Sequence, residues 1–207
     1  MAIIALDARL PAKQMMTVSS KDKDLLKHTG SRLTVGSRLK RATMLHIALM
    51  SSENRAAAAL SRYYPHGRRA FIRKMNNKAR IYKMSKTRFR DPTGLSPGSV
   101  STAHDLLLLV KHASQYPVIR HYSTDKKMSV YTGKGRLVYK SSNGLINNPS
   151  WKIKLQKTGF TNEAGHCLVL NTTIKNKQYI FIILGARKHY GHYADAIHLK
   201  NWLMKNH

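Results

Sequence analysis

The feature that most constrains the fold is a strand-like run near the carboxyl end of the chain. Residues 179–184 read Tyr-Ile-Phe-Ile-Ile-Leu, so apolar side chains would occupy both faces of an extended segment. Such a strand needs cover on both faces and is typical of the middle of a sheet. The turn formers Lys175-Asn176-Lys177 predict a hairpin to a second strand over 166–170. We therefore expect an antiparallel sheet with protein on both sides.

A third strand and several helices accompany this pair. Trp151, Ile153 and Leu155 alternate with polar residues, which is the period of a half-buried strand. Apolar spacings of three and four residues predict helices over 43–62, 67–83, 103–113 and 193–205. The last helix is expected to bury four side chains, those of Ile197, Leu199, Trp202 and Leu203. Residues 120–150 are predicted to be rich in loops with short strands, and the fold class is α+β in one domain over 1–207.

The charge of the chain restricts its partners. It has 37 Lys+Arg against 9 Asp+Glu, a formal net charge of +28, and there is no acidic residue between Glu53 and Asp91. This charge favours polyanions such as nucleic acid, anionic lipid or an acidic cell-wall polymer. The cations mostly fill the positions left between apolar residues at helical spacing, which indicates a solvated helix face. Because no zinc-finger, RRM or KH signature is present, we expect no specific nucleic-acid partner.

Several other classes of protein are excluded. A single cysteine, Cys167, rules out an internal disulfide framework and a multi-cysteine zinc site, and we expect no metal or other cofactor. No apolar run reaches the roughly 18 residues of a membrane span. Residues 1–6 are apolar, but they lack a basic start and a cleavage site, so they are predicted to end a helix rather than to form a signal peptide. Translated as given, the chain would be cytoplasmic.

The candidate chemistry begins with Lys157. This residue extends the apolar face of Trp151, Ile153 and Leu155, where an ammonium group is costly to bury. Thr158 and Gly159 follow it, adding a hydroxyl donor and a residue whose missing side chain lets another molecule approach the backbone. Lys-Thr-Gly at a strand end, and Ser-x-Asn earlier in the chain, are two signatures of penicillin-recognising serine acyltransferases. Residues 52–54, Ser-Glu-Asn, supply the second signature.

Three blocks of sequence, over 50–57, 88–96 and 157–168, occur in register with one known family. Across nearly its whole length the chain resembles the low-molecular-mass penicillin-binding proteins, the D-alanyl-D-alanine peptidases of peptidase family S11. The resemblance implies the β-lactamase/transpeptidase-like fold and a serine-type D-Ala-D-Ala endopeptidase or carboxypeptidase that acts on peptidoglycan cross-links through an acyl-enzyme. It also implies work in the periplasm, with peptidoglycan peptide stems as partners and β-lactams as ligands of complete members.

The resemblance also implies a role for each matching residue. Ser52 would serve the proton relay at the acylation centre, and Asn54 would hold the substrate's amide. Lys157 would direct positive charge at the substrate carboxylate. Thr158 would donate a hydrogen bond to the same carboxylate. The substrate-binding set is completed by Gly159 and by the backbone N–H of Phe160, which would form half of an oxyanion hole.

One departure from the family pattern concerns the nucleophile. Family members carry it in Ser-x-x-Lys at the start of a helix, where the lysine assists deprotonation of the serine. Three tetrapeptides fit this pattern, at 20–23, 37–40 and 123–126, but none begins an apolar helix ahead of Ser52 at the family's distance. In register the motif falls upstream of Met1. We therefore expect a partial domain that lacks its nucleophilic serine, its basic lysine, its first strands and the start of the nucleophile helix.

Two consequences and two alternatives follow. This chain alone is expected to be inactive, and the strand over 179–184 is expected to lack the neighbour that pairs with it in the family. One alternative is a non-catalytic peptidoglycan-binding remnant that uses Asn54, Lys157 and Thr158. The other is a basic nucleic-acid-binding protein, since the charge by itself does not choose among polyanions.

Overall fold

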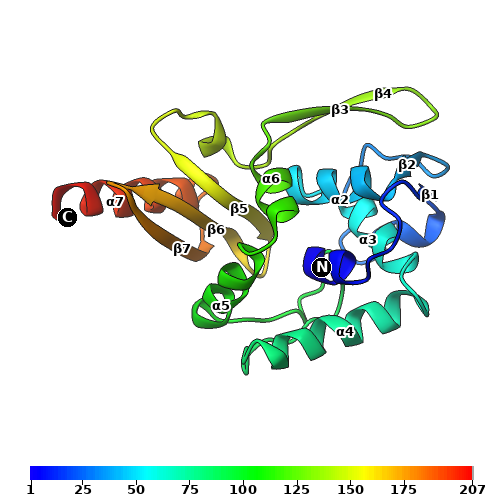
Figure 1. Ribbon diagram of the computed structural model, residues 1–207, viewed down its shortest axis with the longest axis horizontal. Coiled ribbons are helices and arrows are strands. Elements are labelled where there is room, and N and C mark those ends of the chain that lie inside the picture. The colour runs from blue at the N-terminus through cyan, green and yellow to red at the C-terminus, as the bar shows by residue number, and fades with distance from the viewer. Residues whose placement is uncertain (207) are drawn as a thin grey trace.

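The computed structural model describes residues 1–206, with an antiparallel sheet on one side and a group of helices on the other (Figure 1). The helices are α1 (Ala2–Asp7), α2 (Arg41–Met50), α3 (Asn54–Arg62), α4 (Gly67–Ile81), α5 (Ala103–Ala113), α6 (Pro117–Thr124) and α7 (Gly191–Asn206), with short 3-10 helices η1 (Ser20–Asp22) and η2 (Gly144–Asn147). The strands are β1 (Met15–Thr17), β2 (Arg38–Lys40), β3 (Lys127–Tyr131), β4 (Arg136–Lys140), β5 (Lys152–Thr161), β6 (Gly165–Ile174) and β7 (Lys177–Ala186). This confirms the α+β class.

The main sheet has the antiparallel order β5-β6-β7, and β1-β2 and β3-β4 form separate two-stranded ribbons. The predicted hairpin joins β6 to β7, and Lys175 and Asn176 both have positive φ, 44° and 63°, as a tight two-residue turn requires. In the sheet formed by the described residues β7 is an edge strand, so the expectation that residues 179–184 lie in the middle of a sheet is wrong. The expectation that this strand lacks a neighbour on one side is confirmed for the described residues.

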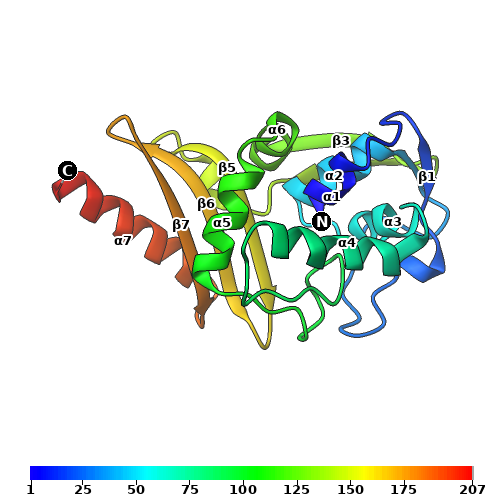
Figure 2. The same ribbon diagram turned by 60° about the horizontal axis from the view of Figure 1, so that its bottom comes forward.

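Helices, rather than a neighbouring strand on each side, explain why β7 is apolar on both faces. Ile180 and Ile182 pack with a core that includes the α5 residue Val110. Phe181 and Ile183 pack with a second core that includes Leu203 of α7. Figure 2 shows α5 and α7 on opposite faces of the sheet. The predicted cover on both faces is therefore present.

A β-bulge changes which residues share a face of β5. Ile153 pairs with Thr172 and Leu155 with Asn171, so Lys154 is an extra residue in the ladder. Because of this extra residue, Ile153 packs in the core beside α7, whereas Leu155 packs in the other core. The prediction of one continuous apolar face is therefore wrong at Trp151 and Ile153, although Lys157 does share a face with Leu155.

Three predictions about helices also need correction. Residues 43–62 form two helices, α2 and α3, separated at 51–53, and the end of α6 overlaps the region over 120–150 that was predicted to be rich in loops. The carboxyl-terminal helix α7 buries Leu203 but leaves three of the expected core residues largely exposed, at 39% for Ile197, 44% for Leu199 and 57% for Trp202. The side of α7 that meets the sheet instead carries Ala196 and His192, both buried.

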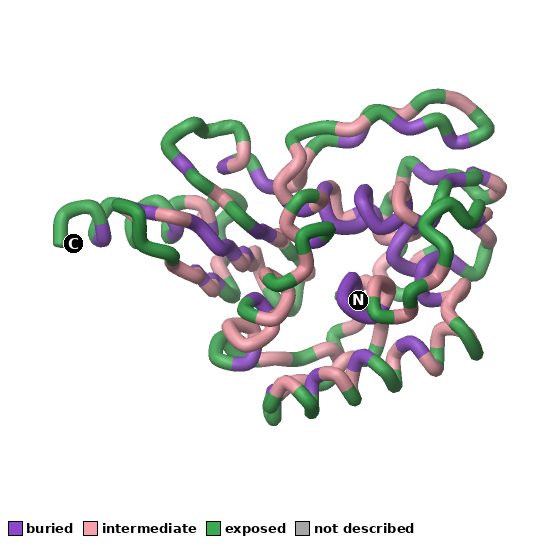
Figure 3. Tube along the Cα trace, viewed as in Figure 1, coloured by how far each residue is buried: buried purple, intermediate pink, exposed green. Residues whose placement is uncertain are grey.

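The most deeply buried helix positions the candidate site. Figure 3 shows α2 as mainly buried, and its last seven residues, from Met44 to Met50, all lie in the interior. Since α2 is fixed by packing on every side, its carboxyl end holds the turn at 51–53 in place beside β5. Within residues 1–206, no helix combines the length and the apolarity needed to cross a bilayer.

Candidate active site

The turn between α2 and α3 presents Ser52. Ser51 ends α2 by donating a hydrogen bond from its hydroxyl to the Ile47 carbonyl at 2.8 Å. Glu53, which is buried, starts α3 by accepting from the backbone N–H of Arg55 at 3.2 Å. Between them Ser52 has a φ of 57°, a left-handed conformation that a serine adopts at a cost. A chain with uninterrupted helix over 43–62 would not bring the Ser52 hydroxyl to the sheet.

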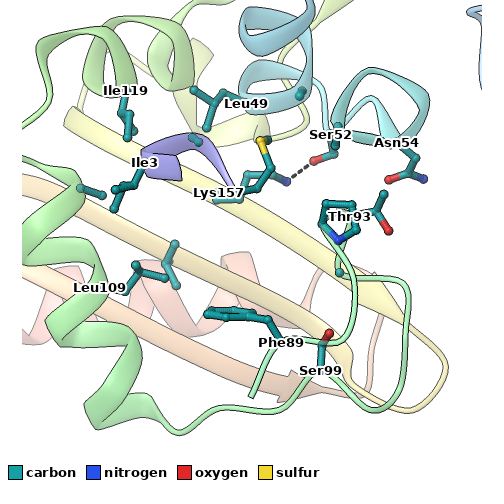
Figure 4. A pocket seen from close by; sticks show the side chains of 18 of the residues that line it. Ile3, Leu49, Ser52, Asn54, Phe89, Thr93, Ser99, Leu109, Ile119 and Lys157 are labelled. Carbon is teal, nitrogen blue, oxygen red and sulfur yellow. Dashed lines mark hydrogen bonds between the residues drawn. The ribbon is translucent and has the colours of Figure 1, made fainter. Parts of the chain in front are cut away.

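Lys157 meets Ser52 across the gap between the helices and the sheet. Its Nζ donates a hydrogen bond to the Ser52 Oγ, as the dashed line in Figure 4 marks. Burial lowers the pKa of the Lys157 ammonium to about 8. Within residues 1–206 no carboxylate lies in salt-bridge range of this ammonium. The site therefore holds a desolvated cation that an incoming anion would stabilise.

Ser142 connects the two halves of the site, and no sequence signal pointed to it. The Thr158 hydroxyl donates to Ser142 Oγ at 2.7 Å, and Ser52 Oγ lies 3.4 Å from the same atom. The backbone of Ser142 is itself held, because its N–H donates to the Met50 carbonyl at 2.9 Å and its carbonyl accepts from Tyr193 at 3.0 Å. A hydroxyl network thus links Ser52 to Thr158.

Asn54 occupies the first turn of α3 on the same side of the site. Its Nδ2 donates to Thr29 Oγ1 at 3.2 Å, and Thr29 in turn donates to Asp24 at 2.9 Å. Although burial opposes ionisation, hydrogen bonds from the 24–29 loop lower the pKa of Asp24 to about 2, so this carboxylate stays charged. The 24–29 loop therefore holds the side-chain amide of Asn54 in place through Thr29.

All six residues predicted for the site line one cavity of about 780 Å³, which we call the cleft: Ser52, Asn54, Lys157, Thr158, Gly159 and Phe160. Apart from Gly159 and its two chain neighbours, no heavy atom lies within 4 Å of the position that a Cβ on Gly159 would occupy, so the strand backbone is open to a ligand there. A smaller, largely apolar hollow of about 300 Å³ adjoins the cleft and shares Ser52, Asn54 and Lys157 with it (Figure 4).

Sequence reasoning missed one wall of the cleft. Five aromatic and imidazole side chains line it: His166, His189, Tyr190, His192 and Tyr193. The exposed ring of Phe160 stacks on His166 with centroids 4.3 Å apart. Burial, with the neighbouring imidazoles, lowers the pKa of His192. The dense run His-Tyr-Gly-His-Tyr at 189–193 was the available signal.

The Ser-x-x-Lys tetrapeptides lie elsewhere. Ser20 is exposed in η1, whereas Ser37 and Ser123 are buried. None of the three serines lines the cleft or the adjoining hollow. The cleft thus gathers the predicted binding residues without any of these serines. No set of three or more His, Cys, Asp or Glu side chains in the described part of the chain is arranged to hold a metal ion.

The chain matches one protein family over most of its length. The peptidase S11 family, described as D-alanyl-D-alanine carboxypeptidase, matches residues 1–188. Two D-alanyl-D-alanine endopeptidases, from Pseudomonas aeruginosa and Escherichia coli K12, are each 44% identical over 204 residues, covering 98% of this chain. The chain spans 66% of the length of each of these relatives.

Solved structures show the same fold. The Streptomyces K15 DD-transpeptidase superposes with a TM-score of 0.86 at 24% identity, covering 97% of this chain and 84% of that one. A D-alanyl-D-alanine carboxypeptidase from Mycobacterium tuberculosis H37Rv gives a TM-score of 0.84 at 23% identity, covering 100% of this chain and 79% of that one. The expected DD-peptidase/transpeptidase-like fold is therefore confirmed.

Proposed function

The chain belongs to the peptidase S11 family of D-alanyl-D-alanine carboxypeptidases, and on that premise we propose that it is a D-Ala-D-Ala endopeptidase/carboxypeptidase domain directed at peptidoglycan cross-links. We propose that residues 1–207 belong to one domain of this kind, which works in the periplasm. The two relatives at 44% identity are endopeptidases, and this favours cleavage within cross-links over trimming of free stems. The observation that carries the proposal is the desolvated Lys157 ammonium against Ser52 in the cleft.

In this proposal the cleft holds the carboxyl end of a peptide. Lys157 attracts the carboxylate, and the Thr158 hydroxyl donates a hydrogen bond to it. β5 is an edge strand, and the open backbone at Gly159 lets an extended peptide lie along it. Asn54 lines the cleft on the opposite side from β5. In this proposal its side chain binds an amide of the same peptide, because it carries both a hydrogen-bond donor and an acceptor.

The chemical step needs a further set of groups. Ser52 would relay a proton at the acylation centre, and the backbone N–H of Phe160 would be one donor of the oxyanion hole. Acyl transfer also requires a nucleophile and a base, and none of the serines at 20, 37 and 123 lies in the cleft. Because such groups act as a unit, we propose that the 207-residue chain by itself binds the peptide but does not form an acyl-enzyme.

A labelling experiment separates the parts of this proposal. The purified 207-residue chain, incubated with a fluorescent penicillin and run on a denaturing gel, is expected to give no labelled band. A chimaera that carries the residues of the Pseudomonas aeruginosa relative ahead of Met1 is expected to give one. A band from the 207-residue chain that disappears in Ser52→Ala or Ser123→Ala would show that a nucleophile is present after all.

Binding without acylation is tested directly. A fluorescently labelled peptide ending in D-Ala-D-Ala should bind the chain in a polarisation assay, and Lys157→Met should weaken that binding by about tenfold or more. Failure of the native chain to bind this peptide would contradict the peptidoglycan assignment. Tyr131→Ala is a suitable control variant, since Tyr131 is 72% exposed on β3 and lies outside the cleft.

A further inference from the structure

A second hollow lies outside the cleft, between α4 and residues 88–90. It has a volume of about 510 Å³ and is lined by Ile72, Asn76, Asn77, Phe89 and four arginines. We call it the arginine groove after those four: Arg73, Arg80, Arg88 and Arg90. Figure 1 places α4 along the lower edge of the molecule, and Figure 2 brings that side forward. All four arginines are exposed.

The walls of the arginine groove are fixed. The Asn76 side chain donates to the Phe89 carbonyl and accepts from the Phe89 N–H, both at 2.8 Å, which ties residues 88–90 to α4. Just before this segment, the buried Asp105 accepts from the Lys86 N–H at 2.8 Å and from the Thr87 hydroxyl at 2.7 Å. The arginines therefore project from two elements held at a constant spacing.

No acidic group neutralises the arginine groove. Within residues 1–206, none of the four guanidinium groups forms a salt bridge. Asp91 is next in sequence, but its carboxylate accepts from the backbone N–H groups of Thr93, Gly94 and Leu95 and from the Ser99 hydroxyl. The groove thus concentrates positive charge that the protein itself leaves uncompensated.

A third hollow joins the arginine groove to the cleft. This intermediate hollow, of about 350 Å³, shares Asn54, Thr93 and Leu95 with the cleft. At its other end it shares Ile72 and Arg90 with the arginine groove. The three hollows therefore adjoin one another from the cleft to the arginines, and the intermediate hollow is also lined by Asp22, Asp24 and Asp91. Its carboxylates make the arginine groove, rather than the intermediate hollow, the place where an acidic group would bind.

We propose that the arginine groove is an accessory binding site for the carboxylates of the same acidic polymer whose peptide occupies the cleft. This inference rests on the proposed function, which makes the polymer peptidoglycan, with free carboxylates on its peptide stems. Arginine is suited to the task because its planar guanidinium binds a carboxylate through two parallel hydrogen bonds. The groove would hold a neighbouring stem and raise the local concentration of cross-links at the cleft.

The test compares two variants of equal charge. Arg73→Gln/Arg80→Gln removes two arginines of the groove, whereas Lys127→Gln/Lys140→Gln removes two exposed lysines from the β3–β4 ribbon. Binding to purified peptidoglycan sacculi is measured by co-sedimentation at fixed salt. The groove variant is expected to bind at least tenfold more weakly than the native chain, and the ribbon variant to stay within twofold. Thermal melts of all three proteins establish that the variants remain folded.

A chemical control identifies the ligand. Sacculi whose carboxylates have been amidated should bind the native chain at least tenfold more weakly than untreated sacculi. Equal binding of treated and untreated sacculi would overturn the proposal, as would equal losses in the two charge variants. If the groove variant loses affinity for duplex DNA while its affinity for sacculi is unchanged, the groove serves nucleic acid instead and the proposal is wrong.

The accessory site and the proposed function fail separately. The small labelled peptide ending in D-Ala-D-Ala reaches only the cleft, so its binding should depend on Lys157 and be unchanged in Arg73→Gln/Arg80→Gln. Peptide binding with no groove effect on sacculi would leave the proposed function standing and remove the accessory site. Groove-dependent binding to sacculi without any binding of the small peptide would leave the carboxylate site in the groove standing and contradict the proposed function of the cleft.

Discussion

The two edges of the main sheet carry opposite kinds of side chain. At the β5 edge Lys157 and Thr158 are half-buried polar residues, and the backbone at Gly159 is open to the cleft. At the β7 edge Phe181 and Ile183 are buried apolar residues under α7. The β7 side chains stabilise the fold, whereas at β5 a desolvated cation is retained at a cost in stability. Such a cost is typical of a position kept for binding.

The first prediction tests the stabilising edge and has the largest expected effect. Phe181 is 6% exposed and meets Trp151 edge to face, with ring centroids 6.2 Å apart. Phe181→Ala should lower the free energy of unfolding by about 3–5 kcal/mol, because it removes buried area and leaves a cavity. Urea denaturation measures the change. Tyr131→Ala, at an exposed position, should change it by less than about 0.5 kcal/mol, and similar losses in both variants would refute the packing described for β7.

The second prediction tests the binding edge. Lys157→Met should weaken binding of a peptide ending in D-Ala-D-Ala by about tenfold or more, since a hydrogen bond to a charged group contributes about 1.5–3 kcal/mol. The same variant should be at least as stable as the native chain, because the ammonium it removes is desolvated and has no carboxylate partner. Peptide titration and urea denaturation give the two quantities. A large loss of stability with unchanged peptide affinity would show that Lys157 stabilises the fold rather than binding the peptide, and would contradict the contrast between the β5 and β7 edges.

The third prediction concerns pH. The pKa of Lys157 is about 8 in the folded chain, against an ordinary value of 10.5. Between these values the unfolded chain holds a proton that the folded chain has released, so this residue makes the free energy of unfolding rise as pH increases from about 8 to 10.5. Peptide affinity should fall over the same interval as the ammonium loses its charge. Parallel titrations of the native chain and of Lys157→Met isolate both effects, and identical pH profiles for the two proteins would contradict the assignment.

The smallest expected effect concerns the backbone opposite β5. Ser52 has a left-handed φ of 57°, which glycine adopts without steric cost. Ser52→Gly and Ser52→Ala both remove the hydroxyl that Lys157 contacts, so their difference reports the backbone alone. The glycine variant should be more stable than the alanine variant by about 1 kcal/mol in urea denaturation. Equal stabilities would mean that the turn at 51–53 is not strained.

Local patterns were sufficient for much of the fold. The period of three and four residues located α4 and α5, and the pair Lys175-Asn176 located the β6–β7 turn, because these signals depend on neighbours in sequence. The break between α2 and α3 was missed, since residues 51–53 resemble a polar patch on one long helix until Ser51 and Glu53 are seen to end and begin helices. Burial along α7 was also mispredicted, because only the sheet decides which side of that helix is covered.

The residues of the candidate site also divide into those that local motifs predicted and those that only packing brought together. Ser52, Asn54, Lys157, Thr158 and Gly159 belong to two short motifs, Phe160 was added by the family resemblance, and all six line the cleft. Ser142 and the cluster of His166, His189 and His192 were not identified, because they come from three other segments with no spacing rule that joins them. Contacts of this kind are set by packing between elements distant in the chain, so single-sequence patterns do not contain them.

By itself, then, the sequence determined the α+β class, the strand and helix content of the last third, the unusual charge and the residue types of the site. Each of these depends on local periodicity, composition or a short motif. The tertiary structure alone decided that a break at 51–53 turns Ser52 towards the sheet, that a bulge separates Ile153 from Leu155, and that the Lys157 ammonium contacts the Ser52 hydroxyl. It also placed the arginine groove beside a hollow that adjoins the cleft. The physical reason is that strand register, burial and the distance between charges depend on which distant segments pack together. The free energy of that packing is a sum over contacts throughout the chain, so no local stretch of sequence determines it.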